Sequence, residues 1–402
     1  MPIVRIPGPH PSVLKEFTVM KAAIISADWN PRADYPVTAE ETRTHMARVG
    51  SSCWQNPSSR VTTLPDPEPG PEDVILRVAA AGLCGSDLHF FETDGEGYMK
   101  YPGMARFPSV PGHEVSGEVV ATGANVKYLK PGDLVCLDDM VCCHRCDSCR
   151  RGFPNQCENL DDVGFTMNGG CAELLKVPES NCWNINGLVS RFGSKAKTLE
   201  AGAVIEPFTV GYNALFECAS RIKPGAYATV FGAGSIGLAV IQLLRATGAV
   251  KVLCFEKNPG RRALATKVGA HGVYDGEDAT KIILEQTAGQ GADVQVECAG
   301  AFNASVPAME AAAANGSQIV IIGRDSKRVP VFLENFQCKK ANIVGAMGNT
   351  GHGTYPNVLR MMAAGLLDPT LFITDRFPLD DFNKAVDQAK TRQGGKVLIT
   401  VA

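Results

Sequence analysis

Short hydrophobic runs alternate with glycine- and proline-rich turns in the first half of the chain. MKAAIIS, from Met20, predicts a first strand, and from Val74 onward further strands follow at short intervals. This texture predicts an antiparallel, strand-rich and partly open β architecture. Residues 28–60 are polar and lack a clean period, which predicts a long excursion over the surface. The residues through Phe17 read as an extension ahead of the first strand.

The pattern changes after about residue 208, where hydrophobic strands alternate with longer helical segments. Residues 226–231 predict a buried strand, and an apolar helix follows at SIGLAVIQLLRAT. A later helix is predicted for ASVPAMEAAAANG, through Gly316. Such alternation implies right-handed crossovers and a doubly wound parallel sheet, so the expected fold class is α/β plus β. The C-terminal segment opens with GNTGHGTYP, which predicts a mobile stretch, and ends in a helix and a strand that can return to the first domain.

Composition supports a globular, multi-domain protein. The chain has 402 residues, 45% of them hydrophobic and 20% charged, and its net charge is −3. These values suggest two or three domains and exclude a disordered or fibrous chain. Without a basic block, we expect no nucleic-acid or membrane-surface partner. The uncharged stretch Gly225 to Leu244 approaches the length of a membrane span, but its glycine pattern explains it better.

The chain contains 14 cysteines. Its first residues lack a hydrophobic core of signal-peptide length, so we expect a reducing, cytoplasmic location in which disulfides are an improbable use for them. Clustered cysteines in that setting more often bind metal. In one cluster the spacing is C-x2-C-x2-C-x7-C, which predicts a closed, tetrahedral structural zinc site held by Cys143, Cys146, Cys149 and Cys157. An iron–sulfur cluster is the competing interpretation, although its spacings differ.

A glycine turn predicts a dinucleotide site. Gly232, Gly234 and Gly237 have GxGxxG spacing between a strand and a helix, where the backbone and the helix N-terminus can bind a pyrophosphate. The spacing alone is a weak signal, but Glu256 ends the next strand, where a carboxylate can accept hydrogen bonds from the adenosine ribose. Because it would repel a 2′-phosphate, NAD is favoured over NADP, although nearby cations can soften that preference. The expected cofactor-binding residues are Gly232, Gly234, Ser235, Ile236, Gly237, Glu256 and Arg261.

A second metal site is indicated by Cys84 in AGLCGSDLHF, His113 in VPGHEVSGEV and Glu206 in AVIEPFTVGY. Each is weak separately, since a single buried cysteine or histidine more often only packs in a core. Together they offer three ligands and leave a fourth zinc position for water or substrate. An open zinc site beside a nicotinamide cofactor can act as a Lewis acid on an alcohol.

In this order, CGSDLH, GHEVSGEV, the four-cysteine lobe, EPFTVGY and VFGAGSIG resemble the zinc-containing medium-chain alcohol and polyol dehydrogenases. The resemblance runs from about Met20 to the C-terminus. It implies a GroES-like catalytic domain over residues 1–208, completed by residues 346–402. It also implies a Rossmann NAD-binding domain over residues 209–345, a cleft between the two, and a homo-oligomer, dimer or tetramer.

The resemblance also implies roles for single residues. Cys84 and His113 match the first two catalytic zinc ligands, and Glu206 matches the position of the third. Glu114 matches a glutamate that is a ligand or a neighbour of the ligands, depending on the coordination state. Asp87 matches a carboxylate that orients the zinc site. Ser86 matches the hydroxyl that passes the alcohol proton onward, and His89 matches the histidine at the end of that proton relay. Val210 matches an apolar residue that packs against the nicotinamide.

The chain departs from the family pattern in four places. The family usually starts near Met20, so residues 1–19 are extra. The segment between Met20 and PDPEPG is longer than usual, and so is the segment that precedes GHE; both are expected to flank the cleft. Sorbitol-type members carry an arginine–tyrosine pair where this chain has Met347, Gly348 and Asn349. Plain sorbitol specificity therefore does not carry over.

The expected function is a zinc-dependent oxidoreductase that transfers hydride between NAD and a secondary alcohol, such as a polyol, sugar or cyclitol. Two zinc ions per chain are expected, one catalytic and one structural. The alternatives are an L-threonine-type amino alcohol or general alcohol dehydrogenase and, in a different class, a non-catalytic nucleotide-binding or structural protein.

Overall fold

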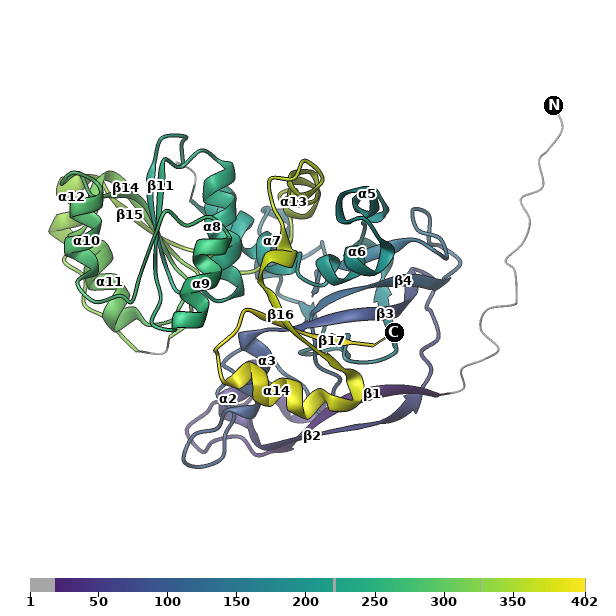
Figure 1. Cartoon of the computed structure of the whole chain (residues 1–402). Coiled ribbons are helices and arrows are strands. Elements are labelled where there is room, and N and C mark those ends of the chain that lie inside the picture. Colours follow the sequence, from purple (N-terminus) through teal and green to yellow (C-terminus); the bar gives the residue numbers. More distant parts are fainter. Residues whose placement is uncertain (1–18, 220–221, 326, 402) are drawn as a thin grey trace.

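The structure is a computed structural model that describes residues 19–219, 222–325 and 327–401. The extension predicted through Phe17 lies outside the described residues. The chain forms a β-rich part and an α/β part (Figure 1). Between them lie α7 (Glu206–Tyr212) and α13 (Thr354–Ala363).

The β-rich part is built on a seven-stranded sheet. Its order is β16 (Ile373–Pro378), β17 (Lys396–Thr400), β3 (Asp73–Leu83), β4 (Glu114–Thr122), β5 (Leu134–Leu137) and β9 (Cys182–Asn184), with β8 (Leu174–Pro178) also paired to β3. Its pairs are antiparallel except β16–β17, which is parallel. The predicted antiparallel architecture is confirmed, and C-terminal strand β17 lies beside β3.

Strand β3 is buried on both faces. Val74, Leu76 and Val78 belong to one hydrophobic cluster, whereas Ile75 and Leu83 belong to another. Alternate side chains of a strand point to opposite faces, so β3 is fixed from both sides up to its end. Cys84, which follows directly, is therefore held on a rigid support.

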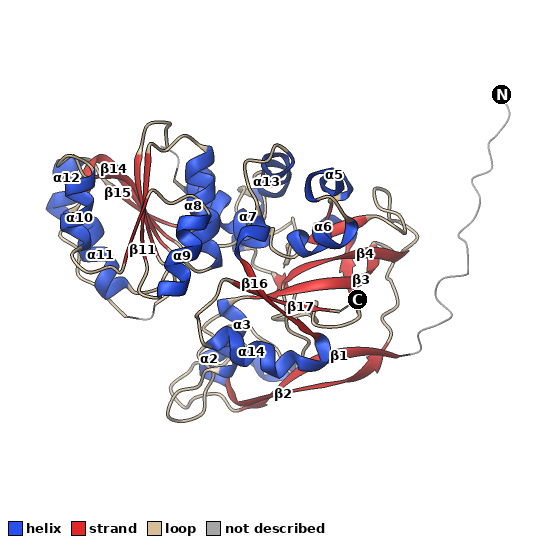
Figure 2. Cartoon of the chain, viewed as in Figure 1, coloured by secondary structure: helices blue, strands red, loops and turns tan. Residues whose placement is uncertain are grey.

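The α/β part is a six-stranded parallel sheet. Its order is β12 (Gly272–Tyr274), β11 (Lys251–Phe255), β10 (Tyr227–Phe231), β13 (Ala292–Glu297), β14 (Ala313–Ile321) and β15 (Asn342–Gly345). Five helices pack on it: α8 (Ser235–Ala246), α9 (Pro259–Lys267), α10 (Ala279–Gln286), α11 (Phe302–Ala311) and α12 (Leu333–Lys339). Figure 2 shows α8 and α9 on one face and α10, α11 and α12 on the other. This is the predicted doubly wound sheet, and its switch point lies at β10.

Shorter elements complete the chain. The helices are α1 (Ala39–Thr44), α2 (Gly50–Cys53), α3 (Gly85–Phe91), α4 (Asp147–Arg150), α5 (Val189–Phe192), α6 (Lys195–Gly202) and α14 (Phe382–Lys390). Two further two-stranded antiparallel sheets are formed, a long one by β1 (Val19–Trp29) with β2 (Trp54–Pro65) and a short one by β6 (Met140–Val141) with β7 (Asp161–Asp162). A π-helical turn spans Asn213–Cys218. Short 3-10 turns span Pro154–Gln156, Glu179–Asn181, Asn186–Leu188, Pro369–Phe372 and Leu379–Asp381.

The segment 28–60, predicted as a long excursion over the surface, lies largely at the surface but contains regular secondary structure. Strand β2 starts at Trp54 and pairs with β1 along most of its length, and two short helices precede it. Trp54 is buried edge-on against Trp29 and Phe107. The apolar residues of this segment are too widely spaced in the sequence to show a period. In the fold, several of them pack into a separate, largely aromatic cluster.

Two further expectations need correction. The helix predicted through Gly316 ends at Ala311, and β14 starts at Ala313, because pairing with β13 overrides the helix propensity of the alanine run. The stretch GNTGHGTYP, expected to be mobile, holds Asn349 and Thr350 in buried positions. The side chains of both donate buried hydrogen bonds to residues far away in the sequence, and the glycine-rich sequence gives no sign of these bonds.

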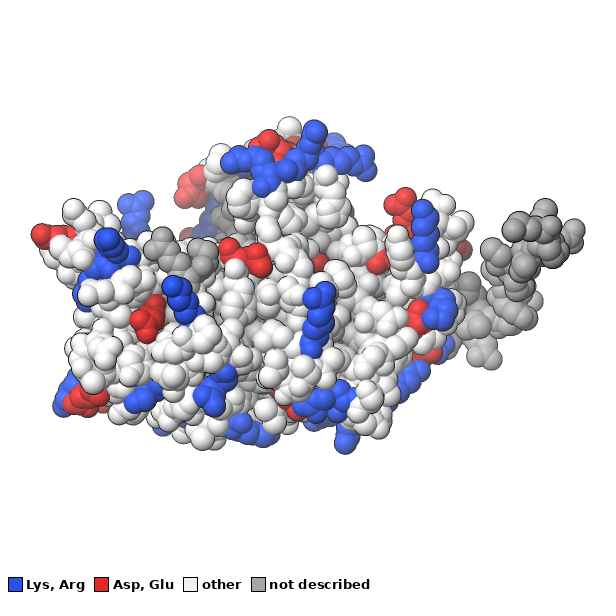
Figure 3. Space-filling model, turned by 90° about the horizontal axis from the view of Figure 1, so that it is seen from above, with Lys and Arg blue, Asp and Glu red and all other residues white. Residues whose placement is uncertain are grey.

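The surface agrees with the near-neutral charge. On the face in Figure 3, basic and acidic side chains occur together rather than in separate fields. Within the described ranges, no helix combines the length and the apolar character needed to cross a membrane. The uncharged stretch from Gly225 is divided between β10, the glycine turn and α8.

Candidate active site

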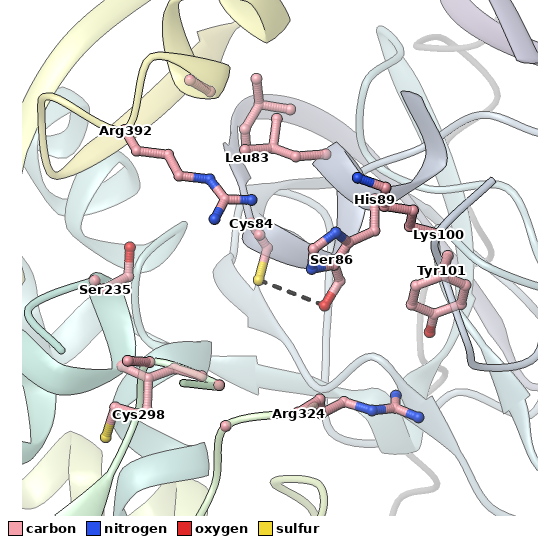
Figure 4. A pocket seen from close by; sticks show the side chains of 18 of the residues that line it. Leu83, Cys84, Ser86, His89, Lys100, Tyr101, Ser235, Cys298, Arg324 and Arg392 are labelled. Carbon is pink, nitrogen blue, oxygen red and sulfur yellow. Dashed lines mark hydrogen bonds between the residues drawn. The ribbon is translucent and has the colours of Figure 1, made fainter. Parts of the chain in front are cut away.

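A cavity of 820 Å³ lies between the β-rich part and the α/β part. The start of α3 lines one side, and the glycine turn before α8 lines another. Figure 4 shows Cys84, Ser86 and His89 facing this space opposite Ser235. The cavity therefore brings together several residues of the two predicted sites, namely Cys84, Ser86, His89, Gly234, Ser235, Ile236 and Arg261.

The register of two strands assembles the metal-type residues. Gly82 of β3 lies opposite Glu114 of β4, so the end of β3 meets the start of β4. A Cβ atom at Gly82 would lie 2.2 Å from Glu114 Oε2, so only glycine leaves room for this carboxylate. Cys84 caps the N-terminus of α3, and its backbone N–H donates to Asp87 Oδ2 over 2.9 Å.

Cys84, His113 and Glu114 form a compact group, in which one potential ligand atom of each lies within 4.8 Å of the others. His113 Nδ1 lies 3.6 Å from the buried Asp87 Oδ1, which leaves the other ring nitrogen free for a metal. Within the described residues, His113 Nδ1, Asp87 Oδ1 and Glu114 Oε2 are buried without a hydrogen-bond partner. The first two of these atoms face each other, whereas Glu114 Oε2 faces no donor, and a buried carboxylate oxygen in this state is costly, so the group fits a cation.

The two glutamates of the site, Glu114 inside this group and Glu206 outside it, have different partners. Glu114 Oε1 accepts a bond of 2.5 Å from the buried ammonium of Lys396, which also donates to Leu83 O over 3.1 Å. Glu206, at the start of α7, lies outside the compact group and accepts a bond of 3.1 Å from Asn349 Nδ2. Burial raises the pKa of Glu206, and the charges of Asp139 and Glu114 add to this effect. A divalent cation would offset this crowding of acids.

The four predicted lobe cysteines lie together, with their sulfur atoms within 4.8 Å of one another. Backbone N–H groups donate to these sulfurs, among them those of Arg145 and Cys146 to Cys143 Sγ over 3.5 and 3.3 Å. These two bonds, together with contacts from Cys157 and Asn159, outweigh the effect of burial and lower the pKa of Cys143 to about 6. Donation to sulfur favours thiolates, so the cluster fits a zinc ion. Cys142 stays outside the cluster, with its thiol directed to Pro154 O over 3.2 Å.

The dinucleotide-type turn has little spare room. A Cβ atom at Gly237 would lie 1.9 Å from Gly232 O, so glycine is required for the turn to pack on α8. Glu256 accepts bonds of 2.8 Å from the N–H groups of Ala233 and Asn258, which fix its carboxylate beside the turn. Arg261 donates to Gly394 O over 3.0 Å.

Not every predicted cofactor residue lines the cavity. Glu256 and Val210 are absent from its lining, as are Gly232 and Gly237. Val210 is half-buried on α7, which packs against α8.

Comparison with known proteins agrees with this geometry. The Alcohol dehydrogenase GroES-like domain matches residues 70–187, and the Zinc-binding dehydrogenase domain matches residues 235–364. A scyllo-inosose 3-dehydrogenase from Thermotoga maritima is 35% identical over 385 residues, which are 92% of this chain and 97% of that protein. The chain belongs to the zinc-containing medium-chain alcohol and polyol dehydrogenases. It is thus an oxidoreductase of a family that uses zinc and a nicotinamide cofactor.

Two further comparisons also find similar proteins. An L-threonine 3-dehydrogenase from Caldanaerobacter subterraneus subsp. tengcongensis is 34% identical over 337 residues, covering 83% of this chain and 92% of that protein. A solved structure described as an alcohol dehydrogenase from Thermotoga maritima superposes with a TM-score of 0.91 at 34% identity. It covers 95% of this chain and 100% of that one.

The two long insertions of this dehydrogenase form one wall of the cavity. Arg32 of the first insertion pairs with Asp94 and Glu96 of the second and lies 3.8 Å from the centre of the Tyr98 ring. The backbone N–H of Ser51 donates to Tyr101 O over 2.7 Å. From this joined wall, the residues that reach the cavity are Arg32, Ser51, Ser52, Asp94, Met99, Lys100, Tyr101 and Pro102.

Sequence reasoning missed three buried residues of the site, Asp139, Asn349 and Lys396. Asp139 accepts a bond of 2.6 Å from Asn349 Nδ2. The only signal for Asp139 is a pair of acids directly after the hydrophobic run LVCL, and for Lys396 it is one lysine opening the strand KVLIT. A charged residue at the edge of a buried strand needs a partner, so the position of Asp139 and Lys396 beside apolar strands is the signal that could have identified them.

Proposed function

We propose that this dehydrogenase oxidises a secondary alcohol of a cyclitol or related polyol and passes the hydride to NAD. The observation that carries the proposal is the single cavity that joins Cys84 and Ser86 to the N-terminus of α8. A helix N-terminus binds phosphate, so a dinucleotide bound there can present its ring to an alcohol held near Cys84. The 35% identical relative acts on a cyclitol ketone by its name, and the joined insertion wall offers hydroxyl and charged groups to such a polar ring.

The metal ligands are assigned to two sites, so that each chain holds two zinc ions. Cys84, His113 and a glutamate hold the catalytic ion, and Asp87 orients His113. The four cysteines of the lobe hold the structural ion. A zinc ion at the first site would supply Lewis acidity that lowers the pKa of a bound alcohol.

Other residues of the chain transfer the proton and bind the cofactor. Ser86 Oγ, 3.8 Å from Cys84 Sγ, accepts the alcohol proton, and His89 passes it toward solvent. Glu256 accepts the ribose hydroxyls and disfavours NADP, and Val210 packs near the nicotinamide. We assign residues 1–208 with 346–402 to the catalytic domain and residues 209–345 to the cofactor domain, in a homo-oligomer located in the cytoplasm.

An amino alcohol such as L-threonine is the second candidate substrate, because a relative at 34% identity is an L-threonine 3-dehydrogenase. The decisive experiment measures NADH formation with NAD and a panel of cyclitols, linear polyols, sugars, L-threonine and simple secondary alcohols. We expect a cyclitol to give the highest kcat/KM, and Cys84→Ser to abolish the rate. The highest value with L-threonine would favour the second candidate. No NADH with any alcohol would favour a non-catalytic nucleotide-binding protein.

A further inference from the structure

Asn349 links two buried carboxylates beside the catalytic metal site. Its Nδ2 atom lies 2.6 Å from Asp139 Oδ1, 3.1 Å from Glu206 Oε1 and 3.3 Å from Tyr355 Oη. All four side chains are buried. Tyr355 gives its own proton to Leu137 O over 2.8 Å, so its oxygen can only accept from Asn349.

This amide has fewer hydrogens than acceptors. Nδ2 carries two hydrogens and faces three acceptor atoms, while Oδ1 of the same amide has no partner among the described residues. The acids, and not a bond made by Oδ1, therefore set the orientation of the amide. The bond to Asp139 is shorter than the bond to Glu206, so of the two carboxylates Glu206 is the one that Asn349 holds less tightly.

The other glutamate of the site is held differently. Lys396 is 1% exposed, and its ammonium pairs with Glu114 at 2.5 Å. Moving Glu114 away would leave a buried charge without its partner, which is costly. Glu206 loses only one shared bond to a neutral amide when it moves. Of the two carboxylates, Glu206 is thus the one free to approach and leave a metal ion.

The backbone of the loop that carries Asn349 is anchored on both sides. Asn213 Nδ2 donates to Gly348 O over 3.0 Å, and Thr354 Oγ1 donates to Asn349 O over 2.6 Å. Thr350 Oγ1 donates to Asp138 Oδ2 over 2.6 Å. Asn349 is therefore held in place while the carboxylate beside it can shift.

We propose that Asn349 is a positioning residue, which holds Glu206 next to Asp139 in the orientation from which it completes the catalytic metal site. The inference rests on the catalytic zinc site assigned above. The proposal assigns a role to Asn349, which lies where the sorbitol-type members carry an arginine–tyrosine pair that this chain lacks. Asn349 acts through Glu206 and contacts neither the alcohol nor the cofactor.

The test measures zinc affinity of the full-length protein by competition with a chromogenic chelator, with the four-cysteine site as an internal reference. Asn349→Ala is expected to weaken the catalytic site by about 10- to 100-fold, the usual effect of losing a residue that orients a metal ligand. In a Glu206→Gln background, Asn349→Ala should cause little further loss. Thr350→Val is the matched control, because it removes a buried bond from the same loop that does not lead to Glu206.

Each outcome decides the inference. Unchanged zinc affinity in Asn349→Ala, or an equal loss in the Glu206→Gln background, overturns it. If Asn349→Ala also loses the structural zinc, the measurement is repeated with Asn349→Ser in place of the alanine variant. Serine keeps a polar group at this position but cannot reach both carboxylates. Cys84→Ser separates the two hypotheses: if that variant keeps both zinc ions, the assigned metal site is wrong. If it loses one ion while Asn349→Ala keeps both, only the positioning role fails.

Discussion

Ser86 and His89 lie three residues apart on α3, so both face the same cavity from one side of the helix. Their surroundings differ. Ser86 Oγ is next to Cys84 Sγ, whereas His89 Nδ1 lies 3.1 Å from Glu92 Oε2 and its side chain is 39% exposed. Partial burial raises the pKa of Glu92, but Arg392 and His89 outweigh it and keep this pKa below its usual value. These surroundings support the proposed proton relay, with Ser86 at its inner end and His89 at its outer end.

Ser86→Ala is expected to lower kcat by about 100-fold or more, because the alcohol proton loses its first acceptor. Zinc content and NAD affinity should stay unchanged, since Ser86 holds neither. His89→Ala should cost about 10-fold, and added imidazole should restore part of the rate, because buffer can replace the outer end of a relay. Steady-state kinetics with and without imidazole measure both. A fully active Ser86→Ala protein would show that the proton leaves by another route.

Glu256→Gln is expected to lower the ratio of NAD to NADP efficiency by about 100-fold, since it weakens a ribose bond and removes the repulsion of a 2′-phosphate, each worth about 1–2 kcal/mol. Glutamine keeps an oxygen that can accept from the Ala233 N–H, so the glycine turn should persist. The measurement is kcat/KM for both cofactors. Glu277→Gln, an exposed acid of the same part of the chain, is the control. An unchanged ratio would shift attention to Arg261, which lines the cavity.

Among single residues, the sequence predicted the site residues that stand in a motif of known spacing and missed those that do not. Cys84 and His113 stand in short motifs, and the structure places them in one compact group with Glu114. Lys396 lies 282 positions from its partner Glu114, and Asn349 lies 210 positions from Asp139. No local pattern records such pairings, because only the closed fold brings them together.

Among the elements, helices and strands with a strong period were predicted, and those stabilised by distant contacts were not. β10 and α8 carry their own signals, an apolar run and an apolar helix after a glycine turn. β2 has little hydrophobic alternation, and it forms because β1 offers it a partner edge. β12 has three residues, and α12 has no buried residue to mark its inner face.

Helix α1 shows how such an element is held by one side chain. Glu41 is 2% exposed and accepts bonds from Tyr35 Oη, from the Thr38 N–H and hydroxyl, and from the Arg48 N–H, over 2.8–2.9 Å. Burial raises the pKa of Glu41, but the N–H groups of Arg48 and Thr38 outweigh it and lower the value to about 2. Because the pKa is lower in the folded state, ionised Glu41 stabilises the fold above the ordinary value of about 4.5. This stabilisation is lost as the pH falls from there toward about 2.

Glu41→Gln is therefore expected to destabilise the protein by about 1–3 kcal/mol near neutral pH, the usual cost of losing bonds to a buried charge. The difference from wild type should shrink as the pH falls below about 4.5. Urea midpoints measured over a pH series test this. Glu40→Gln is the control, since Glu40 is exposed and pairs only with exposed Arg43 among the described residues. A difference that stays constant down to low pH would mean that the charge of Glu41 contributes nothing.

At the scale of the whole molecule, one core serves both parts of the chain. The largest hydrophobic cluster includes Leu134 of β5, Phe208 of α7 and Val240 of α8. The β-rich part and the α/β part are thus packed together through one hydrophobic cluster. A shared core fixes the distance between the metal-type residues and the glycine turn, as hydride transfer requires.

The outer edge of the parallel sheet is the surface best suited to contact with a second copy of the chain. β15 is the last strand and pairs with β14 alone among the described residues. Ile343 on this strand is 44% exposed, and Phe332 and Leu333, at the start of α12, are 57% and 72% exposed. Figure 1 shows α12 and β15 on the same side of the molecule. An open edge with exposed apolar side chains favours pairing with another chain.

If the protein is the proposed homo-oligomer, we expect Ile343→Lys to convert it into a smaller species, because a charge on an edge strand opposes pairing between two copies. Light scattering coupled to size-exclusion chromatography measures the mass of the wild-type protein and of the variant. Tyr128→Lys is the matched control, since Tyr128 is 86% exposed and lies outside the α/β part. The cavity does not include Ile343, so kcat/KM should change little when the assembly dissociates. A monomeric wild-type protein, or an Ile343→Lys variant of unchanged mass, would show that this edge is not the contact.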